Sequence, residues 1–284
     1  MEFKKINNLK LPVLGMGTWG IGGKLEVDTS HDKENIYAIK KAIEFGITHI
    51  DTAELYAQGH TEELVGEAIS DFKRNTVFIT TKVSPENLRY NDLIASAKSS
   101  LKRLKINYID LYLVHHWNPN IPIEETMSAM DFLVRNKLIR FIGVSNFSVE
   151  QLIEAQAHTK NKIVANQIEY NLLARNEGQF TKSMEKKIIP FCQLNDIFVI
   201  AFKPLARGRL TGGFKILDDL AKKYGKTQTQ IVINWLIYKK NIVTIPKSTN
   251  LMHVAENLGS IGWRLEKEDI IKLNNFKAPV TIRK

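Results

Sequence analysis

Short apolar runs alternate with amphipathic segments along most of the chain. Each run is a few residues long and nearly continuous, which is typical of strands buried in a parallel sheet. The predicted strands cover residues 14–17, 48–51, 77–83, 109–115, 141–145, 163–170, 198–203 and 242–246. Between them, hydrophobic residues recur at helical spacing, as at Ile36, Ile39 and Ile43. The predicted helices cover residues 35–45, 61–70, 90–104, 123–136, 148–159, 179–193, 218–224, 227–239, 251–260 and 267–276.

Eight strands, each followed by a helix, predict a (β/α)8 TIM barrel that forms a single domain over residues 1–284. Before the first strand, residues 3–6 and 10–13 predict a β-hairpin with its turn at Asn7-Asn8. An open doubly wound sheet is the alternative. No G-x-G-x-x-G motif follows the first strand, which disfavours the dinucleotide-binding form of that fold.

Composition and charge narrow the class of protein. The net charge is +10, but the basic residues are scattered or paired, so they indicate a lysine-rich surface rather than a nucleic-acid site. No apolar run approaches the ~20 residues of a membrane span. The beginning of the chain lacks the apolar core of a secretory signal, and Cys192 is the only cysteine. We therefore expect a cytoplasmic protein without nucleic-acid or membrane partners.

Polar residues stand where several predicted strands end. Asp51, Lys82 and His115 end three consecutive strands, and active sites of barrels lie at this end. His115 shares strand parity with Leu111 and Leu113, so its side chain can face the barrel interior. Lys82 shares parity with Thr80 and can do the same. We expect these side chains to be neighbours.

Tyr56 follows Asp51 by five positions, and the four residues together suggest proton transfer. A buried Lys82 needs a counter-charge, which Asp51 can supply. An ammonium beside a phenol favours the phenolate, so we expect the pKa of Tyr56 to fall below its usual ~10. Tyr56 could then protonate an alkoxide while His115 orients the carbonyl oxygen. Each residue alone could be structural; together they indicate carbonyl reduction, which requires a hydride-carrying cofactor.

Nine stretches carry a family resemblance that runs nearly from end to end. They are GMGTWG (15–20), HIDTAELY (49–56), ITTKV (79–83), IDLYLVH (109–115), IGVSNF (142–147), NQIEYN (166–171), AFKPLARG (201–208), and IPKS with AEN (245–248, 255–257). In these stretches the chain resembles the aldo-keto reductases. The resemblance implies a catalytic tetrad of Asp51, Tyr56, Lys82 and His115, with Tyr56 as the acid, and a substrate pocket bordered by Trp19, Tyr56, His115 and His116.

The same resemblance implies a nicotinamide nucleotide site. Ser145, Asn146 and Gln167 would hydrogen-bond the carboxamide, and Phe202 would stack on the nicotinamide ring. Lys247 and Ser248 would meet the 2′-phosphate, with Glu256 and Asn257 at the adenine and the helix after Ser248 offering its N-terminal amides. The remaining implied cofactor contacts come from the same stretches: Gly17, Thr18, Trp19, Asp51, Lys203, Pro204, Leu205, Arg207 and His253.

Three departures from the family pattern bear on specificity. His253 stands where relatives that prefer NADP(H) usually have Arg; Lys247 still favours NADPH/NADP+, with NADH/NAD+ possible. His116 takes the place of a substrate-facing Trp. Lys203 replaces a common Ser and would reach either the pyrophosphate or solvent. The tail after Phe276 is short and basic, with Lys277, Arg283 and Lys284, and it predicts an open pocket.

The resulting hypothesis is an NAD(P)H-dependent oxidoreductase that reduces aldehydes or ketones reversibly, with a proton from Tyr56 and no metal. A regulatory or scaffolding protein that binds the nucleotide with little turnover is the alternative, and an intact tetrad argues against it. A barrel isomerase or lyase would leave Ser145, Asn146 and Gln167 without a role. The sequence does not distinguish a monomer from a dimer.

Overall fold

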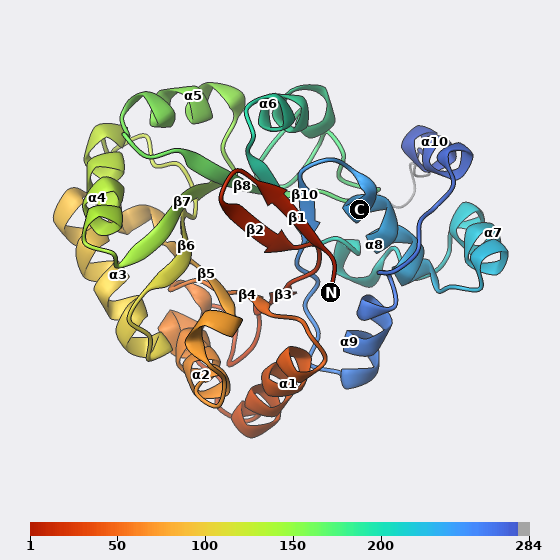
Figure 1. Ribbon diagram of the computed structural model, residues 1–284, viewed down its shortest axis with the longest axis horizontal. Coiled ribbons are helices and arrows are strands. Elements are labelled where there is room, and N and C mark those ends of the chain that lie inside the picture. Colours follow the sequence, from red (N-terminus) through yellow and green to blue (C-terminus); the bar gives the residue numbers. More distant parts are fainter. Residues whose placement is uncertain (278–284) are drawn as a thin grey trace.

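A computed structural model gives the structure of the protein, and it describes residues 1–277. Figure 1 shows the strands at the centre, with the hairpin over them and the helices around them. The tail residues Arg283 and Lys284, from which an open pocket was predicted, lie outside the described residues. The prediction of one domain over the whole chain stays a prediction.

Eight parallel strands form one curled sheet in chain order, which confirms the predicted (β/α)8 fold. They are β3 (Met16–Gly17), β4 (His49–Asp51), β5 (Phe78–Val83), β6 (Ile109–Val114), β7 (Ile139–Ser145), β8 (Ile163–Glu169), β9 (Phe198–Phe202) and β10 (Ile242–Thr244). A parallel bridge between Leu14 and Thr244 joins the two outer strands. There the Gly15 amide donates to the Thr244 carbonyl at 2.8 Å, and the Thr244 amide donates to the Val13 carbonyl at 3.0 Å. The sheet is therefore closed into a barrel.

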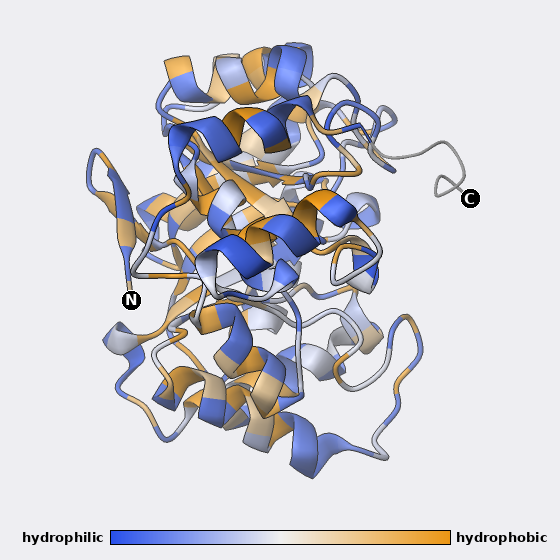
Figure 2. Ribbon diagram, turned by 90° about the vertical axis from the view of Figure 1, so that its right-hand side faces the viewer, coloured by the Kyte–Doolittle hydropathy of each residue, from blue (hydrophilic) through white to orange (hydrophobic). Residues whose placement is uncertain are grey.

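Helices cover the outside of this sheet. They are α1 (Asp32–Glu44), α2 (His60–Ile69), α3 (Tyr90–Leu104), α4 (Ile123–Arg135), α5 (Val149–Ala157), α6 (Ile189–Leu194), α7 (Lys215–Tyr224), α8 (Gln228–Tyr238), α9 (Leu251–Leu258) and α10 (Lys267–Asn275). Figure 2 shows hydrophobic and hydrophilic residues mixed along these helices, as expected where one face packs on a sheet. Among residues 1–277, no helix has the length and apolar character that crossing a bilayer requires.

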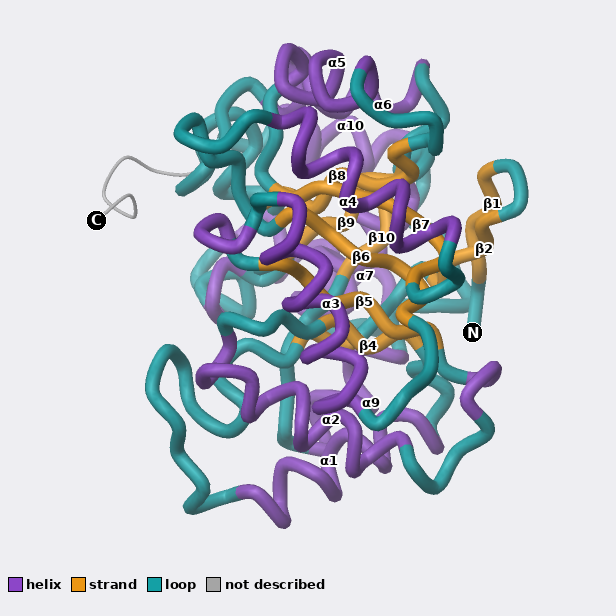
Figure 3. Tube along the Cα trace, turned by 90° about the vertical axis from the view of Figure 1, so that its left-hand side faces the viewer, coloured by secondary structure: helices purple, strands orange, loops and turns teal. Residues whose placement is uncertain are grey.

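The predicted hairpin closes one end of the barrel. Its strands β1 (Phe3–Ile6) and β2 (Leu9–Pro12) pair antiparallel, and Asn7 in the turn has a φ of 51°. Ile6, Leu9 and Leu11 join one apolar cluster with inward-facing residues of the strands: Leu111, Leu113, Ala165, Phe198, Ile200, Val243 and Ile245. Figure 3 shows the hairpin at one end and the long loop into α1 at the other. The open end of the barrel is thus the one at the carboxyl ends of the strands.

The predicted helix over residues 179–193 is wrong in its first part. Residues 179–183 form a turn in which the Ser183 amide donates to the Asn176 carbonyl and the Gln179 amide donates to the Glu169 carboxylate. Ser183 has a φ of 56°, which an α-helix cannot contain. A π-helical turn (Met184–Ile188) follows and leads into α6.

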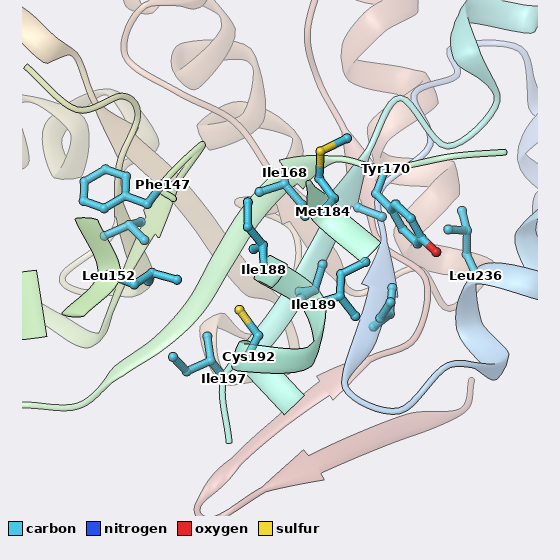
Figure 4. Packing of buried hydrophobic residues seen from close by; sticks show 14 of the residues in the cluster. Phe147, Leu152, Ile168, Tyr170, Met184, Ile188, Ile189, Cys192, Ile197 and Leu236 are labelled. Atoms are coloured by element: carbon cyan, nitrogen blue, oxygen red, sulfur yellow. The ribbon is translucent and has the colours of Figure 1, made fainter. Parts of the chain in front are cut away.

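This π-helical turn and α6 still bury apolar side chains against the sheet. Figure 4 shows Met184 near Ile168 and Tyr170, and Cys192 near Ile188 and Ile197. Burial raises the pKa of the Cys192 thiol to about 12. The single cysteine is therefore a core residue without thiolate reactivity at neutral pH.

Candidate active site

Lys82 is the centre of a buried polar cluster at the open end of the barrel. Its Nζ donates to Asp51 Oδ1 at 2.6 Å, to the Thr52 carbonyl at 2.7 Å and to Tyr56 Oη at 3.3 Å. The side chains of Lys82 and Asp51 are almost fully buried. Three acceptors use the three donors of the ammonium group, so the buried charge is both paired and fully hydrogen-bonded.

The parallel strands bring these residues together. Asp51 is opposite Thr80 in the β4–β5 register, and Lys82 is opposite Leu113 in the β5–β6 register. Lys82 therefore extends beyond Asp51 along the barrel axis and reaches back to its carboxylate. Tyr56 returns to the same point because the Thr52 amide donates to the Thr80 carbonyl and holds the chain to β5 after β4 ends.

The expected direction of the Tyr56 pKa is wrong. Burial raises the pKa of Tyr56 above its usual value, and the nearby Asp51 carboxylate adds to the rise. The Lys82 ammonium lowers the pKa, but it does not overcome burial. The enclosure of the phenol at the barrel mouth was not visible in the sequence. Tyr56 is therefore protonated throughout the neutral range.

His115 follows β6 and lies beside Tyr56. Its amide donates to the Val83 carbonyl at 3.0 Å, and its ring centroid is 5.8 Å from that of Tyr56. Burial, the Lys82 ammonium and His116 hold the pKa of His115 well below its usual range. The imidazole is therefore neutral at physiological pH. Its Nδ1 is buried without a protein partner, so it can take part in a contact with a bound molecule.

Aromatic rings form a continuous row across the mouth of the barrel. The Trp19 ring contacts Tyr56 at 4.9 Å between centroids, His115 stacks on His116 at 5.1 Å, and His116 meets Phe180 at 4.6 Å. The row thus places His116 next to the polar cluster, and its contact with a substrate stays a prediction. Trp19 and Phe180, at its two ends, are exposed by 40% and 50%. Large exposed rings beside buried polar groups are typical of a ligand pocket.

Phe180 was missed by the sequence analysis. It belongs to the turn that was predicted as part of the helix over residues 179–193. The helical periodicity of that range gives no sign of a site residue. The signal that could have found it is local: a lone aromatic residue in the polar stretch 175–183. The turn that carries Phe180 is braced by Lys203, whose Nζ donates to Gln179 Oε1 at 2.7 Å and lies 3.6 Å from Glu169 Oε2.

Lys203 is therefore held by side chains of the protein, and its contact with the pyrophosphate stays a prediction. It has a φ of 50° at the end of β9, and its Nζ lies 5.4 Å from the centroid of the Phe202 ring. The rest of this stretch leaves the strand: Pro204 is buried, Leu205 is half-buried and Arg207 is exposed. Contacts of these residues with a nucleotide stay predictions.

Ser145, Asn146 and Gln167 come together where β7 and β8 end. Ser145 Oγ donates to the Gln167 carbonyl at 3.0 Å, and Asn146 Nδ2 donates to Ser145 Oγ at 2.9 Å. Gln167 Nε2 donates to Asp51 Oδ2 at 2.6 Å, so this amide is tied to the polar cluster. Asn146 Oδ1 is buried without a partner. One unpartnered acceptor thus lies where β7 and β8 end, and the contact with an amide stays a prediction.

Gly17 and Thr18 close the other side of the cluster. A Cβ on Gly17 would stand 2.9 Å from the Ile245 carbonyl, so glycine permits a close approach of two backbone segments. Thr18 is fully buried, and its Oγ1 donates to the Asp51 carbonyl at 2.9 Å. Both residues hold the loop of Trp19 against the end of β4.

The stretch after β10 borders a cleft of about 840 Å³ together with Trp19 and the loop into α1. Lys247 lines this cleft, and burial lowers its pKa. Ser248 is engaged locally, because its Oγ donates to the Asn250 carbonyl, while Asn250 Oδ1 accepts the Met252 amide and caps α9. This helix begins close to where the sequence predicted it.

The expected adenine end of the site lies on α9. The His253 side chain is 62% exposed, and its Nδ1 lies 3.9 Å from Glu256. Asn257 is buried, and its Oδ1 has no protein partner. His253 is thus free to meet a ligand, but a carboxylate stands beside it. Within residues 1–277, no cluster of three or more His, Cys, Asp or Glu side chains is arranged to hold a metal ion.

Comparison with known proteins shows the family of this chain. The model of the aldo/keto reductase family matches residues 13–278. The methylglyoxal reductase YeaE of Escherichia coli is 34% identical over 278 residues, which cover 96% of this chain and 93% of that protein. The chain belongs to the aldo/keto reductase family, and it is an enzyme of the oxidoreductase class.

Solved structures show the same fold. The thermostable aldo-keto reductase Tm1743, in complex with the inhibitor epalrestat, superposes with a TM-score of 0.91 at 43% identity, covering 96% of this chain and 99% of that one. An aldo-keto reductase from Klebsiella pneumoniae in complex with NADPH superposes with a TM-score of 0.85 at 31% identity, covering 96% and 95%.

Proposed function

We propose that the protein is an NADPH-dependent reductase of small aldehydes and ketones, with Tyr56 as the proton donor. The observation that carries this proposal is the position of Lys82 Nζ, within hydrogen-bonding distance of both Asp51 and Tyr56. A structural ion pair needs only Asp51. The contact between Lys82 Nζ and Tyr56 Oη links the charge to a phenol, and a phenol beside an ammonium suits proton donation.

The residues present fit a nicotinamide nucleotide. Asn146 Oδ1 and Asn257 Oδ1 are buried acceptors without protein partners, and amide or amino donors of such a molecule would satisfy them. Lys247 lines the cleft beside Trp19 and supplies a positive charge. When bound, the reduced nucleotide supplies a hydride to the carbonyl carbon. The NADPH complex of the Klebsiella pneumoniae relative supports NADPH as this nucleotide.

The protein's own side chains supply the proton and orient the substrate oxygen. Tyr56 O–H hydrogen-bonds the substrate oxygen and gives up its proton as that oxygen gains charge. Lys82 stabilises the phenolate left behind, and Asp51 keeps Lys82 charged and in place. Neutral His115 can donate one hydrogen bond to the same oxygen and fix its direction. Tyr56 recovers its proton from solvent when the product leaves.

Small oxoaldehydes are the substrates that the comparisons favour. The Escherichia coli relative is named a methylglyoxal reductase, and it covers almost the whole of this chain. The aromatic row would border such a substrate, with His116 as a polar wall and Phe180 as an apolar one.

NADPH and NADH oxidation with a panel of aldehydes tests the proposal. Tyr56→Phe should lower kcat by at least about 100-fold, the range of general acid catalysis, while nucleotide still binds. Tyr238→Phe, at the exposed last residue of α8, is the matched control and should keep full activity. Turnover that survives Tyr56→Phe would exclude Tyr56 as the donor. Nucleotide binding without turnover of any carbonyl by the unmodified protein would favour a regulatory role.

A further inference from the structure

The segment that directly follows Tyr56 has an unusual backbone. Ala57, Gln58 and Gly59 have φ values of 45°, 55° and 92°, so three consecutive residues are left-handed. Only glycine adopts this region readily, and other residues keep it only where the surroundings impose it. The Ala57 amide donates to the Lys24 carbonyl at 2.6 Å, which is one such restraint.

Arg103 provides a second restraint from outside the barrel. A Cβ on Gly59 would stand 2.7 Å from Cδ and Nε of Arg103, so the guanidinium stem of this α3 residue lies directly against the Gly59 backbone. The positive φ and this close contact both require glycine at position 59. Arg103 therefore packs against the last residue of the left-handed segment.

Glu62 holds Arg103 in this position. It lies in the first turn of α2, its side chain is fully buried, and Arg103 donates to its Oε2 from Nε at 2.7 Å. The other oxygen, Oε1, accepts from Thr81 Oγ1 at 2.5 Å. Thr81 precedes Lys82 on β5. One buried carboxylate is thus connected on one side to the segment of Tyr56 and on the other to the strand of Lys82.

Glu54, which precedes Tyr56 in the chain, also contacts Arg103. Its Oε1 accepts from the Ser84 amide at 2.7 Å, and its Oε2 lies 4.0 Å from Arg103 Nη2. The residues before and after Tyr56 are therefore both linked to the same guanidinium.

We propose that Glu62 and Arg103 are positioning residues that set the distance between the Tyr56 hydroxyl and Lys82. This inference rests on the proposed role of Tyr56. The contact from Lys82 Nζ to Tyr56 Oη is 3.3 Å long, near the upper limit of a hydrogen bond, so a small displacement breaks it. A buried ion pair contributes little to stability by itself, and a fixed geometry is a benefit that its burial can bring.

Two pairs of variants test this inference. Glu62→Gln keeps the side chain's shape and removes the charge that holds Arg103. Its control is Asp110→Asn on β6, which lies outside the catalytic cluster. This variant removes a similarly buried carboxylate that pairs with Arg74 and Arg140. Gly59→Ala pushes Arg103 away, whereas Gly46→Ala, at φ +100° with nothing within 4 Å, imposes similar backbone strain without a contact.

We expect Glu62→Gln and Gly59→Ala to lower kcat by about 100-fold, the effect of a displacement of about 1 Å, with little change in KM or in the Kd for NADPH. Hydrogen exchange at the Ala57 amide should become faster in both variants without any ligand. Asp110→Asn and Gly46→Ala should lower Tm by similar amounts, with kcat and this exchange rate unchanged.

The inference is overturned if each test variant matches its control in kcat and in exchange at Ala57. Thr81→Val, which deletes one hydrogen bond and keeps the side-chain shape, covers the case in which Glu62→Gln fails to fold. It should lower kcat in the same way, and unchanged kcat would count against the inference. Tyr56→Phe separates the two proposals: if Tyr56→Phe is inactive and Glu62→Gln is normal, only the positioning role fails.

Discussion

Gln167 Nε2 donates a hydrogen bond to Asp51 Oδ2 at 2.6 Å. The carboxylate that neutralises Lys82 is therefore also held from β8, across the barrel from its own strand. A residue expected only at the nicotinamide thus has a second task, which is to keep Asp51 oriented.

Gln167→Glu should place a second carboxylate against Asp51. Like charges at this distance raise the pKa of one carboxyl group in the folded state. A raised carboxyl pKa favours the folded protein at low pH and costs stability as the pH rises above the unfolded value of about 4.3. We expect the Tm difference from the wild type to be small at about pH 4 and to grow by several degrees toward pH 7. Gln167→Leu, without the charge, should show a loss that does not depend on pH, and the same pH profile for both variants would contradict this account.

His49 should make the protein sensitive to acid. It is fully buried on β4, its Nε2 lies 2.9 Å from Thr80 Oγ1, and burial lowers its pKa to about 4. A histidine whose folded pKa is depressed stabilises the folded state above its unfolded pKa of about 6.5 and loses that contribution as the pH falls toward 4. The loss is on the order of 3 kcal/mol.

Urea unfolding between about pH 7 and pH 4 measures this effect. His49→Gln keeps a polar group near Thr80 and cannot be protonated, so its stability should fall less steeply over this range. An unchanged slope in the variant would assign the acid sensitivity to other groups, such as His115.

Phe180 should influence substrate choice. Phe180→Ala removes the exposed ring that meets His116, so carbonyl compounds with an aromatic or long apolar substituent lose contact area. We expect KM for such substrates to rise by about tenfold, equivalent to about 1.4 kcal/mol, with little change for methylglyoxal. Leu194→Ala, at an exposed position on α6, is the control. Equal changes for large and small substrates would place Phe180 outside the pocket.

His253→Arg should strengthen discrimination for NADPH. Arg offers a permanent charge and two parallel donors to a phosphate, whereas His253 is an exposed imidazole near Glu256. We expect the Kd for NADPH to fall by about tenfold and that for NADH to change much less. Met252→Arg adds the same charge at the neighbouring exposed position. If both variants tighten NADPH equally, the effect is one of general charge, and His253 does not face the 2′-phosphate.

The sequence predicted the parts of this site that strand periodicity controls. Asp51, Lys82 and His115 could be placed together because the carboxyl ends of neighbouring strands meet at one end of a closed barrel. Tyr56 followed from its short distance to Asp51 along the chain. Their catalytic and nucleotide-binding roles stay predictions.

What could not be predicted depends on tertiary enclosure and on loop conformation. The rise in the Tyr56 pKa comes from burial by several segments, which no local pattern reveals. The partners of Lys203 and the position of Phe180 depend on a turn closed by Asn176 and Glu169, and helical periodicity concealed that turn. The sequence pattern of Glu62 is that of any acidic residue in the first turn of a helix, so its contacts with Thr81 and Arg103 could not be predicted.

The closure of the barrel has a consequence for how the protein is made. Lys4 on the hairpin donates from Nζ to the Ile242 carbonyl, a residue 238 positions later in the chain, and the Leu14–Thr244 bridge lies beside it. During synthesis, the hairpin lacks this partner until nearly the whole chain has left the ribosome. Contacts between residues so far apart in the sequence form slowly, because closing the long loop between them costs conformational entropy before the contact forms. Nascent chains that lack β10 should therefore leave one edge of the N-terminal segment unpaired and open to chaperones, and closure of the barrel would be the last step of folding.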